Sequence, residues 1–435
     1  MLFLILFWLL IGPDTLAVKA EQAKQAMAAG DFNRAIELYS ELDRAVPGNV
    51  AIEQNLGLAL YSAGQYADAG TVFEKVLQTD PNNRPALLFT GIGANRLNEP
   101  RRAIPFLAKF LAEAGENATA RLEIGISYLA VAKQDFDWID DHAPFSSEWF
   151  ALMARFELEK NHYAKAFQLF HKAQSGSSAT PGIHAGLADI YRRTGHPDWA
   201  SIEDQRERKV VGSADSEASR RYLEAIGSQQ NAAEALEHLT RLPDGPEVHE
   251  LLGFAYRAQH RDTESAQEFH RALQLQPANF RLKKEWAVSL WLSGDCSAAE
   301  RAIKPLLGTN PTSPQLSHVM GDCLVKDNEP EAALPLLITV LKRDPAFFPA
   351  EASLGRAYMH LGRYRDAIPH LKKALVLNDR LTLYQLAQAY KKIGENTEAD
   401  RYLREFNRYQ NSTNNFSHLS NNAEIAAPRP ERAER

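Results

Sequence analysis

Small residues and prolines recur every 34 positions along this chain. The spacing holds for three glycines in the N-terminal half, Gly57, Gly91 and Gly125, and for the prolines at 277, 311 and 345. Alanines follow the same period at 35, 69 and 103 and again at 299, 333 and 367. A fixed period of this length predicts an array of similar units that stack on their neighbours, not a few independent globular domains.

The content of one unit explains the period. In residues 348–381, apolar and small residues fall at i, i+4 and i+7 on either side of a short turn that contains Gly362. This pattern predicts two amphipathic helices joined as a hairpin. Gly355 and Ala367 would let the helices approach closely, and the Asp-Pro pairs at 80–81 and 344–345 would end second helices. The pattern resembles the tetratricopeptide repeat (TPR) over residues 16–409.

The resemblance implies an all-α fold, a right-handed superhelical solenoid of about twelve helix-turn-helix hairpins. The predicted units are 16–49, 50–83, 84–117, 118–146, 147–180, 181–214, 215–245, 246–279, 280–313, 314–347, 348–379 and 380–409. The pattern is irregular in 118–245, where the second helix of 181–214 would bury Asp204 and Glu207. We expect the solenoid to occupy 18–409 and residues 410–435, which are polar, to form a disordered tail.

The chain begins with an uninterrupted apolar run, MLFLILFWLLI, at residues 1–11. As a helix this run would rise only about 16 Å, which is too short for a hydrocarbon core of about 30 Å. It fits the apolar region of a signal peptide at 1–17, although no Lys or Arg precedes it; an uncleaved hydrophobic anchor is the alternative. We expect an exported protein, periplasmic or secreted, with membrane contact only through this segment.

No pattern in the sequence indicates catalysis. The phosphate-binding loop, the dinucleotide fingerprint, the hydrolase nucleophile elbow and the zinc-protease motif are all missing from the sequence. The net charge of −6 gives no broad basic surface for nucleic acid. The basic residues at 206–221 alternate with acidic ones, which favours a solvated helix surface. We therefore expect no enzyme, no cofactor, no small-molecule substrate and no nucleic-acid partner.

Two smaller features each have two interpretations. Four aspartates precede His142, at 135, 137, 140 and 141, and could supply ligands to a cation; a solvated helix end is the favoured interpretation, so no metal is expected. Cys296 and Cys323 lie in adjacent units, where they would form either a disulfide in an exported protein or, as we favour, two buried thiols.

The concave face of TPR proteins uses first-helix positions that do not carry the core pattern. In units two to four these positions are mostly apolar: Leu58, Tyr61, Leu88, Ile92, Asn95, Leu122, Ile126 and Leu129. They indicate either a hydrophobic docking groove for a helix or an extended peptide, or side chains hidden in the core. In units nine to twelve the positions are rich in cations: Arg281, Lys284, His318, Lys326, Arg356, His360, Lys391 and Lys392, with Asp322. They would attract an acidic segment or form ordinary surface charge.

The resemblance implies a non-catalytic scaffold that binds peptide or protein partners in the concave groove. TPR proteins of the bacterial envelope suggest a role in envelope assembly or secretion. The alternative is an accessory or regulatory subunit that docks a separately encoded enzyme. A two-carboxylate clamp for chaperone tails is not expected, because only Asn55 stands at a matching position.

Overall fold

The computed structural model describes residues 13–176, 180–210, 216–309, 313–377, 380–417 and 425–426. In these residues the regular structure consists of 22 α-helices and one short 3-10 helix, without any strand. The all-α fold predicted from the repeat pattern is confirmed. The chain divides into two compact units, which are described separately: Met1–Lys133 with Ile226–Leu251, and Gln134–Ala225 with Leu252–Arg435.

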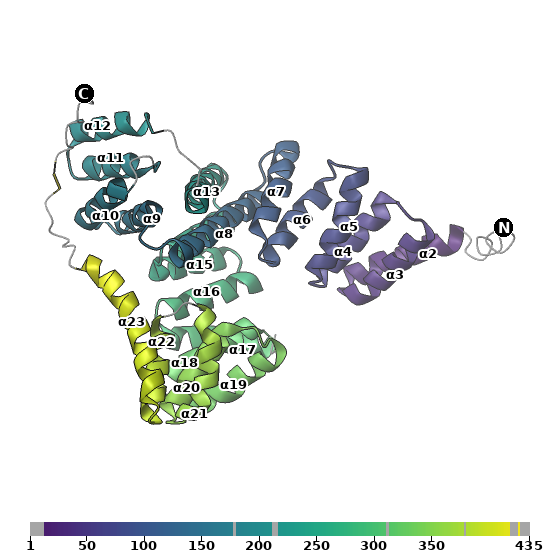
Figure 1. The fold of residues 1–435 in the computed structure, drawn as a ribbon. Coiled ribbons are helices and arrows are strands. Elements are labelled where there is room, and N and C mark those ends of the chain that lie inside the picture. Colours follow the sequence, from purple (N-terminus) through teal and green to yellow (C-terminus); the bar gives the residue numbers. More distant parts are fainter. Residues whose placement is uncertain are drawn as a thin grey trace. The chain divides into compact units, whose positions relative to one another are not determined.

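The first unit begins with three helix hairpins, which Figure 1 shows as successive antiparallel pairs. Their helices are α2 (Pro13–Ala28), α3 (Phe32–Ala45), α4 (Val50–Ser62), α5 (Tyr66–Thr79), α6 (Arg84–Arg96) and α7 (Pro100–Ala114). Each hairpin matches one predicted unit. Asparagine side chains before α4 and α6 cap the helix N-termini, since Asn49 accepts from Ile52 N at 3.2 Å and Asn83 accepts from Ala86 N at 3.1 Å.

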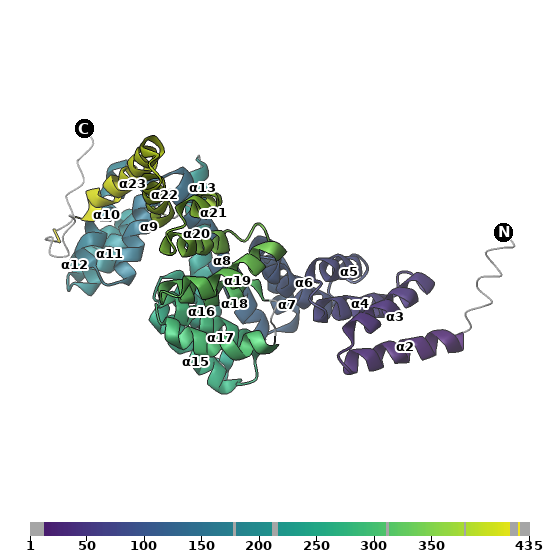
Figure 2. The same cartoon turned by 90° about the horizontal axis from the view of Figure 1, so that it is seen from below.

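The second unit contains the remaining hairpins, which can be followed in Figure 2. Two of them come early in the chain: α9 (Ser147–Glu159), α10 (Tyr163–Gly176), α11 (Ile183–Arg193) and α12 (Pro197–Glu207). The others are α15 (Asp262–Leu275), α16 (Phe280–Leu292), α17 (Cys296–Thr309), α18 (Pro314–Lys326), α19 (Pro330–Arg343), α20 (Phe348–His360), α21 (Tyr364–Ala374), α22 (Arg380–Lys392) and α23 (Asn396–Ser417). The first helix of the 246–279 hairpin, α14 (Pro246–Ala258), crosses the boundary between the units.

Two predicted hairpins are instead single long helices. Residues 118–146 contain α8 (Ala118–His142) and residues 215–245 contain α13 (Glu217–Thr240). In the first unit, Ala120, Leu122 and Ile124 of α8 share one core cluster with Ala235 and Leu239 of α13. In the second unit, Asp135 of α8 accepts a hydrogen bond from Arg221 of α13 at 2.9 Å. Later residues of α8 thus meet earlier residues of α13, so the two helices pair antiparallel.

The period of 34 has a backbone cause at the hairpin turns. Gly30 and Gly64 have φ of 77° and 79°, and Asn98 takes φ of 60° at the next equivalent position. The same spacing joins His260, Gly294, Asn328 and Gly362, with φ of 55°, 88°, 63° and 69°. Glycine and, less readily, asparagine adopt this left-handed conformation, which ends a helix and turns the chain.

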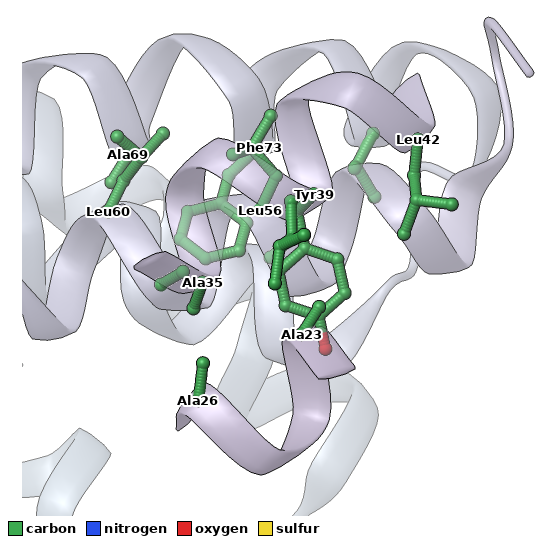
Figure 3. Packing of buried hydrophobic residues seen from close by; sticks show 13 residues of the cluster. Ala23, Ala26, Ala35, Tyr39, Leu42, Leu56, Leu60, Ala69 and Phe73 are labelled. Carbon is green, nitrogen blue, oxygen red and sulfur yellow. The ribbon is translucent and has the colours of Figure 1, made fainter. Parts of the chain in front are cut away.

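The glycines inside the first helices, such as Gly57 and Gly355, recur because of helix packing. A Cβ on Gly57 would lie 2.6 Å from the ring of Phe73, and one on Gly355 would lie 2.6 Å from Leu371 Cδ2. Only glycine allows the first and second helices to approach so closely. Figure 3 shows how the Tyr39 and Phe73 rings fill the space among small residues such as Ala23 and Ala35.

The structure describes only part of each end of the chain. The apolar run at 1–11 lies outside the described residues, while α2 begins at Pro13, within the predicted signal segment 1–17. At the other end α23 continues to Ser417, beyond the boundary predicted at 410. The rest of the predicted tail lies outside the described residues, except for Ile425 and Ala426. In the described part of the chain, no helix combines the length and apolarity that crossing a membrane requires.

Candidate protein-binding face

The first-helix positions predicted to be apolar lie on α4, α6 and the part of α8 in the first unit. Two of the side chains are buried, Ile92 at 5% exposure and Leu122 at 2%. The other five are half-buried and keep part of their surface open to solvent: Leu58, Tyr61, Leu88, Ile126 and Leu129. We call these seven residues the apolar stripe.

The apolar stripe is continuous across three helices. Tyr61, Leu88, Ile126 and Leu129 all pack against the core cluster that contains Ile92 and Leu122. Leu58 packs with Tyr61 against the neighbouring cluster. The Tyr61 ring also meets the Phe89 ring edge to face, with centroids 4.9 Å apart. Part of the stripe therefore belongs to the core, and the remainder is an apolar surface held in place by that core.

A buried polar network fixes α6 against α8 beside the stripe. Glu123, only 1% exposed, accepts from Arg96 Nη2 at 2.7 Å and from Asn95 Nδ2 at 2.9 Å. Ser127 in turn donates to Asn95 Oδ1 at 2.7 Å. Asn95, predicted to line the groove, thus supports the face through a hydrogen-bonded network. Such networks specify one arrangement of neighbouring helices when each member has its partners.

The cations predicted in the C-terminal half have acidic partners at two of the three most prominent positions. Lys284 Nζ lies 3.3 Å from Glu285, and Arg356 forms an ion pair with Asp322. Lys392, on α22, is exposed. At these three positions two cations are paired and one lysine is exposed, and pairing reduces the positive field that an acidic segment would meet.

Asp322 is the centre of a buried polar cluster in the second unit. It accepts hydrogen bonds from Ser353 Oγ at 2.7 Å and Trp291 Nε1 at 2.8 Å, and Lys326 Nζ lies 3.1 Å away. Burial alone would raise the pKa of this carboxyl, but Arg356, Ser353 and Lys326 outweigh burial and hold the pKa below its usual range.

His318 lies beside this cluster and contacts Ser353 Oγ through Nε2 at 3.2 Å. Burial lowers the pKa of His318 to about 4, and the nearby Arg356 also acts against a second positive charge there. His318 is therefore neutral near pH 7, and the cluster stays a single ionised carboxylate with its cationic partners.

The other candidates from the sequence show structural roles. Cys296 and Cys323 are both free and buried in one core cluster, so the structure contains two thiols there. Among the described residues no group of three or more His, Cys, Asp or Glu side chains is placed to hold a metal ion. In the basic segment, Arg206 pairs with Glu203 at 2.6 Å and Arg220 with Glu217 at 2.6 Å.

Comparison with known proteins identifies the repeats. A sequence profile described as tetratricopeptide repeat matches residues 26–89 and 324–380, and a second profile of the same description matches 381–412. Residues 26–89 and 324–412 are thus tetratricopeptide repeats. TPR repeats generally bind protein partners, and TPR folds are generally non-catalytic scaffolds.

Individual relatives are distant. Protein CTR9 homolog of Arabidopsis thaliana is 35% identical over 81 residues, which are 18% of this chain and 7% of that protein. A tetratricopeptide repeat protein from Parabacteroides merdae ATCC 43184 has 14% identity and a TM-score of 0.41, covering 79% of this chain and 99% of its own. MamA from Desulfovibrio magneticus RS-1 has 18% identity and a TM-score of 0.33, covering 39% of this chain and 97% of its own.

The sequence did not reveal one cavity in the TPR array. A cavity of about 290 Å³ lies in the first unit, between α7, α8 and α13. Tyr128 and Ile124 of α8 face it together with Glu234 of α13. The contributing segments are about a hundred residues apart, and no local motif in either helix marks the pairing of α8 with α13.

Proposed function

We propose that this TPR protein is a non-catalytic scaffold that binds a protein or peptide partner on the concave side of its first unit, through the apolar stripe. The observation that carries the proposal is the continuous, partly exposed apolar surface on α4, α6 and α8. Apolar surface that stays exposed to water is unfavourable in an isolated chain. Surfaces of this kind are typical of sites for partner helices or extended peptides.

The charges of the C-terminal half support this choice of face. Lys284 and Arg356 already have carboxylate partners, so an acidic ligand would have to compete with Glu285 and Asp322. Binding to the apolar stripe would instead be driven by removing apolar surface from water, at about 25 cal/mol per Å² before association costs. We therefore expect partner binding to depend only weakly on salt.

The test uses half-buried members of the stripe, since buried Ile92 and Leu122 would confound folding with binding. We expect Leu88→Asp with Ile126→Asp to reduce partner capture from the native cell by at least about tenfold, because binding would bury two carboxylates. Leu97→Asp is the matched control, since Leu97 is an apolar residue of the same unit, 36% exposed, and outside the stripe. Circular dichroism checks folding. Equal capture by the parent, the double variant and the Leu97→Asp control would refute the proposed face.

We further propose export through the apolar run at 1–11, and a role in envelope assembly or secretion. N-terminal sequencing of the mature protein should then begin between residues 18 and 21. An intact N-terminus on chains recovered from the cytosol would contradict export. If the captured partner were an enzyme and not an envelope component, the accessory-subunit role would replace the envelope role.

A further inference from the structure

The two hairpins between α8 and α13 form a lobe of the second unit, α9–α12, whose third helix, α11, is largely buried. Seven of the eleven residues of α11 are buried, including its last aromatic, Tyr191. Its N-terminus is closed by Glu207, whose carboxylate accepts from Gly182 N at 2.6 Å and Ala185 N at 3.0 Å. Little of the surface of α11 is therefore open to solvent, and one of its contacts comes from outside the lobe.

This contact comes from the far end of the chain. The hydroxyl of Tyr191 donates to the backbone carbonyl of Ala426 at 2.8 Å, across a sequence separation of 235 residues. Ile425, the preceding residue, is half-buried. The Tyr191 ring is 0% exposed and is held by Phe167 and Trp199, with centroids 6.0 Å and 5.5 Å away.

The chemistry of this contact is that of peptide recognition through the backbone. A buried tyrosine hydroxyl needs a hydrogen-bond partner, and a backbone carbonyl is an acceptor that any peptide offers. Burial, with the charge of Glu203, raises the pKa of Tyr191 to about 12, so the hydroxyl keeps its proton and remains a donor at neutral pH. Ile425, the residue before this carbonyl group, has an apolar and half-buried side chain.

We propose that the Tyr191 surface of α11 and α12 is a binding site for an extended peptide, and that the chain's own C-terminal segment at Ile425–Ala426 occupies it. Only a short stretch separates this segment from the end of α23 at Ser417. A short tether gives an effective concentration on the order of mM, so even a weak site is filled from within the same chain. The site lies in the second unit, whereas the apolar stripe lies in the first, and neither proposal depends on the other.

The location is tested on the full-length chain with a benzophenone amino acid at position 425. After illumination, mass spectrometry should find the adduct within residues 183–207 of the same chain, with a yield independent of protein concentration. Adducts elsewhere in the chain would overturn the proposal. Adducts that join two chains and increase with concentration would replace the internal segment with a second copy as the occupant, and so would overturn it too.

The energetics are tested with a fluorescein-labelled peptide of residues 418–435 and fluorescence anisotropy. In the full-length chain Ile425→Asp should weaken the internal contact, so the free peptide should bind this variant at least about tenfold more tightly than the parent. Adding Tyr191→Phe should weaken peptide binding by about two- to tenfold, the range for one net hydrogen bond. Equal affinity for the parent and for Ile425→Asp would show that the site is not occupied internally.

Tyr222→Phe is the matched control. Tyr222 is also buried, and its hydroxyl donates to the Pro181 carbonyl at 2.9 Å, so its loss removes a similar hydrogen bond away from Ala426. We expect this variant, in the Ile425→Asp chain, to bind the peptide unchanged. An equal loss in both variants would mean that Tyr191 acts only through the stability of the lobe, which would overturn the proposal.

Discussion

Replacing Gly355 with alanine tests the physical origin of the repeat. The new Cβ would lie 2.6 Å from Leu371 Cδ2, 2.7 Å from its Cγ and 3.3 Å from its backbone nitrogen. Overpacking of this kind costs about 1–3 kcal/mol, while alanine in a helix interior gains about 1 kcal/mol over glycine. We therefore expect a net loss of up to about 2 kcal/mol of stability in the α20–α21 hairpin.

Gly227 supplies the control, because it also lies within a helix but has no atom within 4 Å of the added Cβ. Gly227→Ala should stabilise α13 by about 1 kcal/mol. In a second background, Leu371→Ala removes the obstructing side chain, and there Gly355→Ala should become stabilising. The difference between the two backgrounds measures the overpacking directly.

The assay is hydrogen exchange read by mass spectrometry for peptides of α20 and α13, because repeat arrays open locally and a single melting temperature would average over units. We expect Gly355→Ala to make exchange in α20 faster in the parent chain. In the Leu371→Ala background we expect the same substitution to make exchange in α20 slower. If Gly355→Ala slowed exchange as much as Gly227→Ala does, close helix approach would not explain the glycine period.

Three further predictions concern the buried groups of the second unit. Because burial lowers the pKa of His318 to about 4 in the folded chain, the free energy of unfolding should fall by about 3 kcal/mol as the pH drops from 6.5 to 4. In urea titrations His318→Gln should remove most of this pH dependence. Asp322→Asn should cost about 3 kcal/mol in the same assay, since it leaves Arg356 without its buried partner. Burial raises the thiol pKa of Cys296 and Cys323, so both should react with Ellman's reagent only after urea unfolding; rapid native reaction would contradict their placement.

Most of the array could be predicted from local sequence because its causes are local. The turn glycines such as Gly64 set the ends of first helices, and Asp344 caps α19 just before a proline. Ten of the twelve predicted units are hairpins close to the predicted boundaries, although α23 continues beyond its boundary to Ser417. Each of these features depends on backbone conformation or on close helix contact within one unit, so the sequence of that unit is sufficient.

The charged residues were harder to interpret because their partners lie in neighbouring helices. Asp204 and Glu207 seemed misplaced in a second helix, but Asp204 pairs with Arg192 at 2.6 Å and Glu207 caps α11. Arg356 looked like part of a cationic surface, yet Asp322 on the preceding first helix neutralises it. A pattern within one unit does not show which charges meet across units, so free and paired cations look alike in sequence.

The irregular middle of the chain follows from the pairing of α8 with α13. Neither a glycine nor a proline occurs between Ser127 and His142, so nothing ends α8 where a hairpin would turn, and the helix continues. Its second-helix partner is supplied by α13 after the α9–α12 lobe. Gly125 of α8 shows that α13 takes the place of the missing second helix. A Cβ on Gly125 would lie 3.4 Å from Ala235 of α13 and 2.8 Å from Leu251 of α14.

This arrangement makes α8 and α13 one repeat unit with two hairpins inserted between its helices. The glycine period therefore breaks between Gly125 and Gly253, although the stacking in the first unit continues through Ala235 and Leu251. An insertion at a hairpin turn leaves the paired faces of both helices intact, which is why the array tolerates it. The inserted lobe consists of two further hairpins, and it is in this lobe that Tyr191 meets the C-terminal segment.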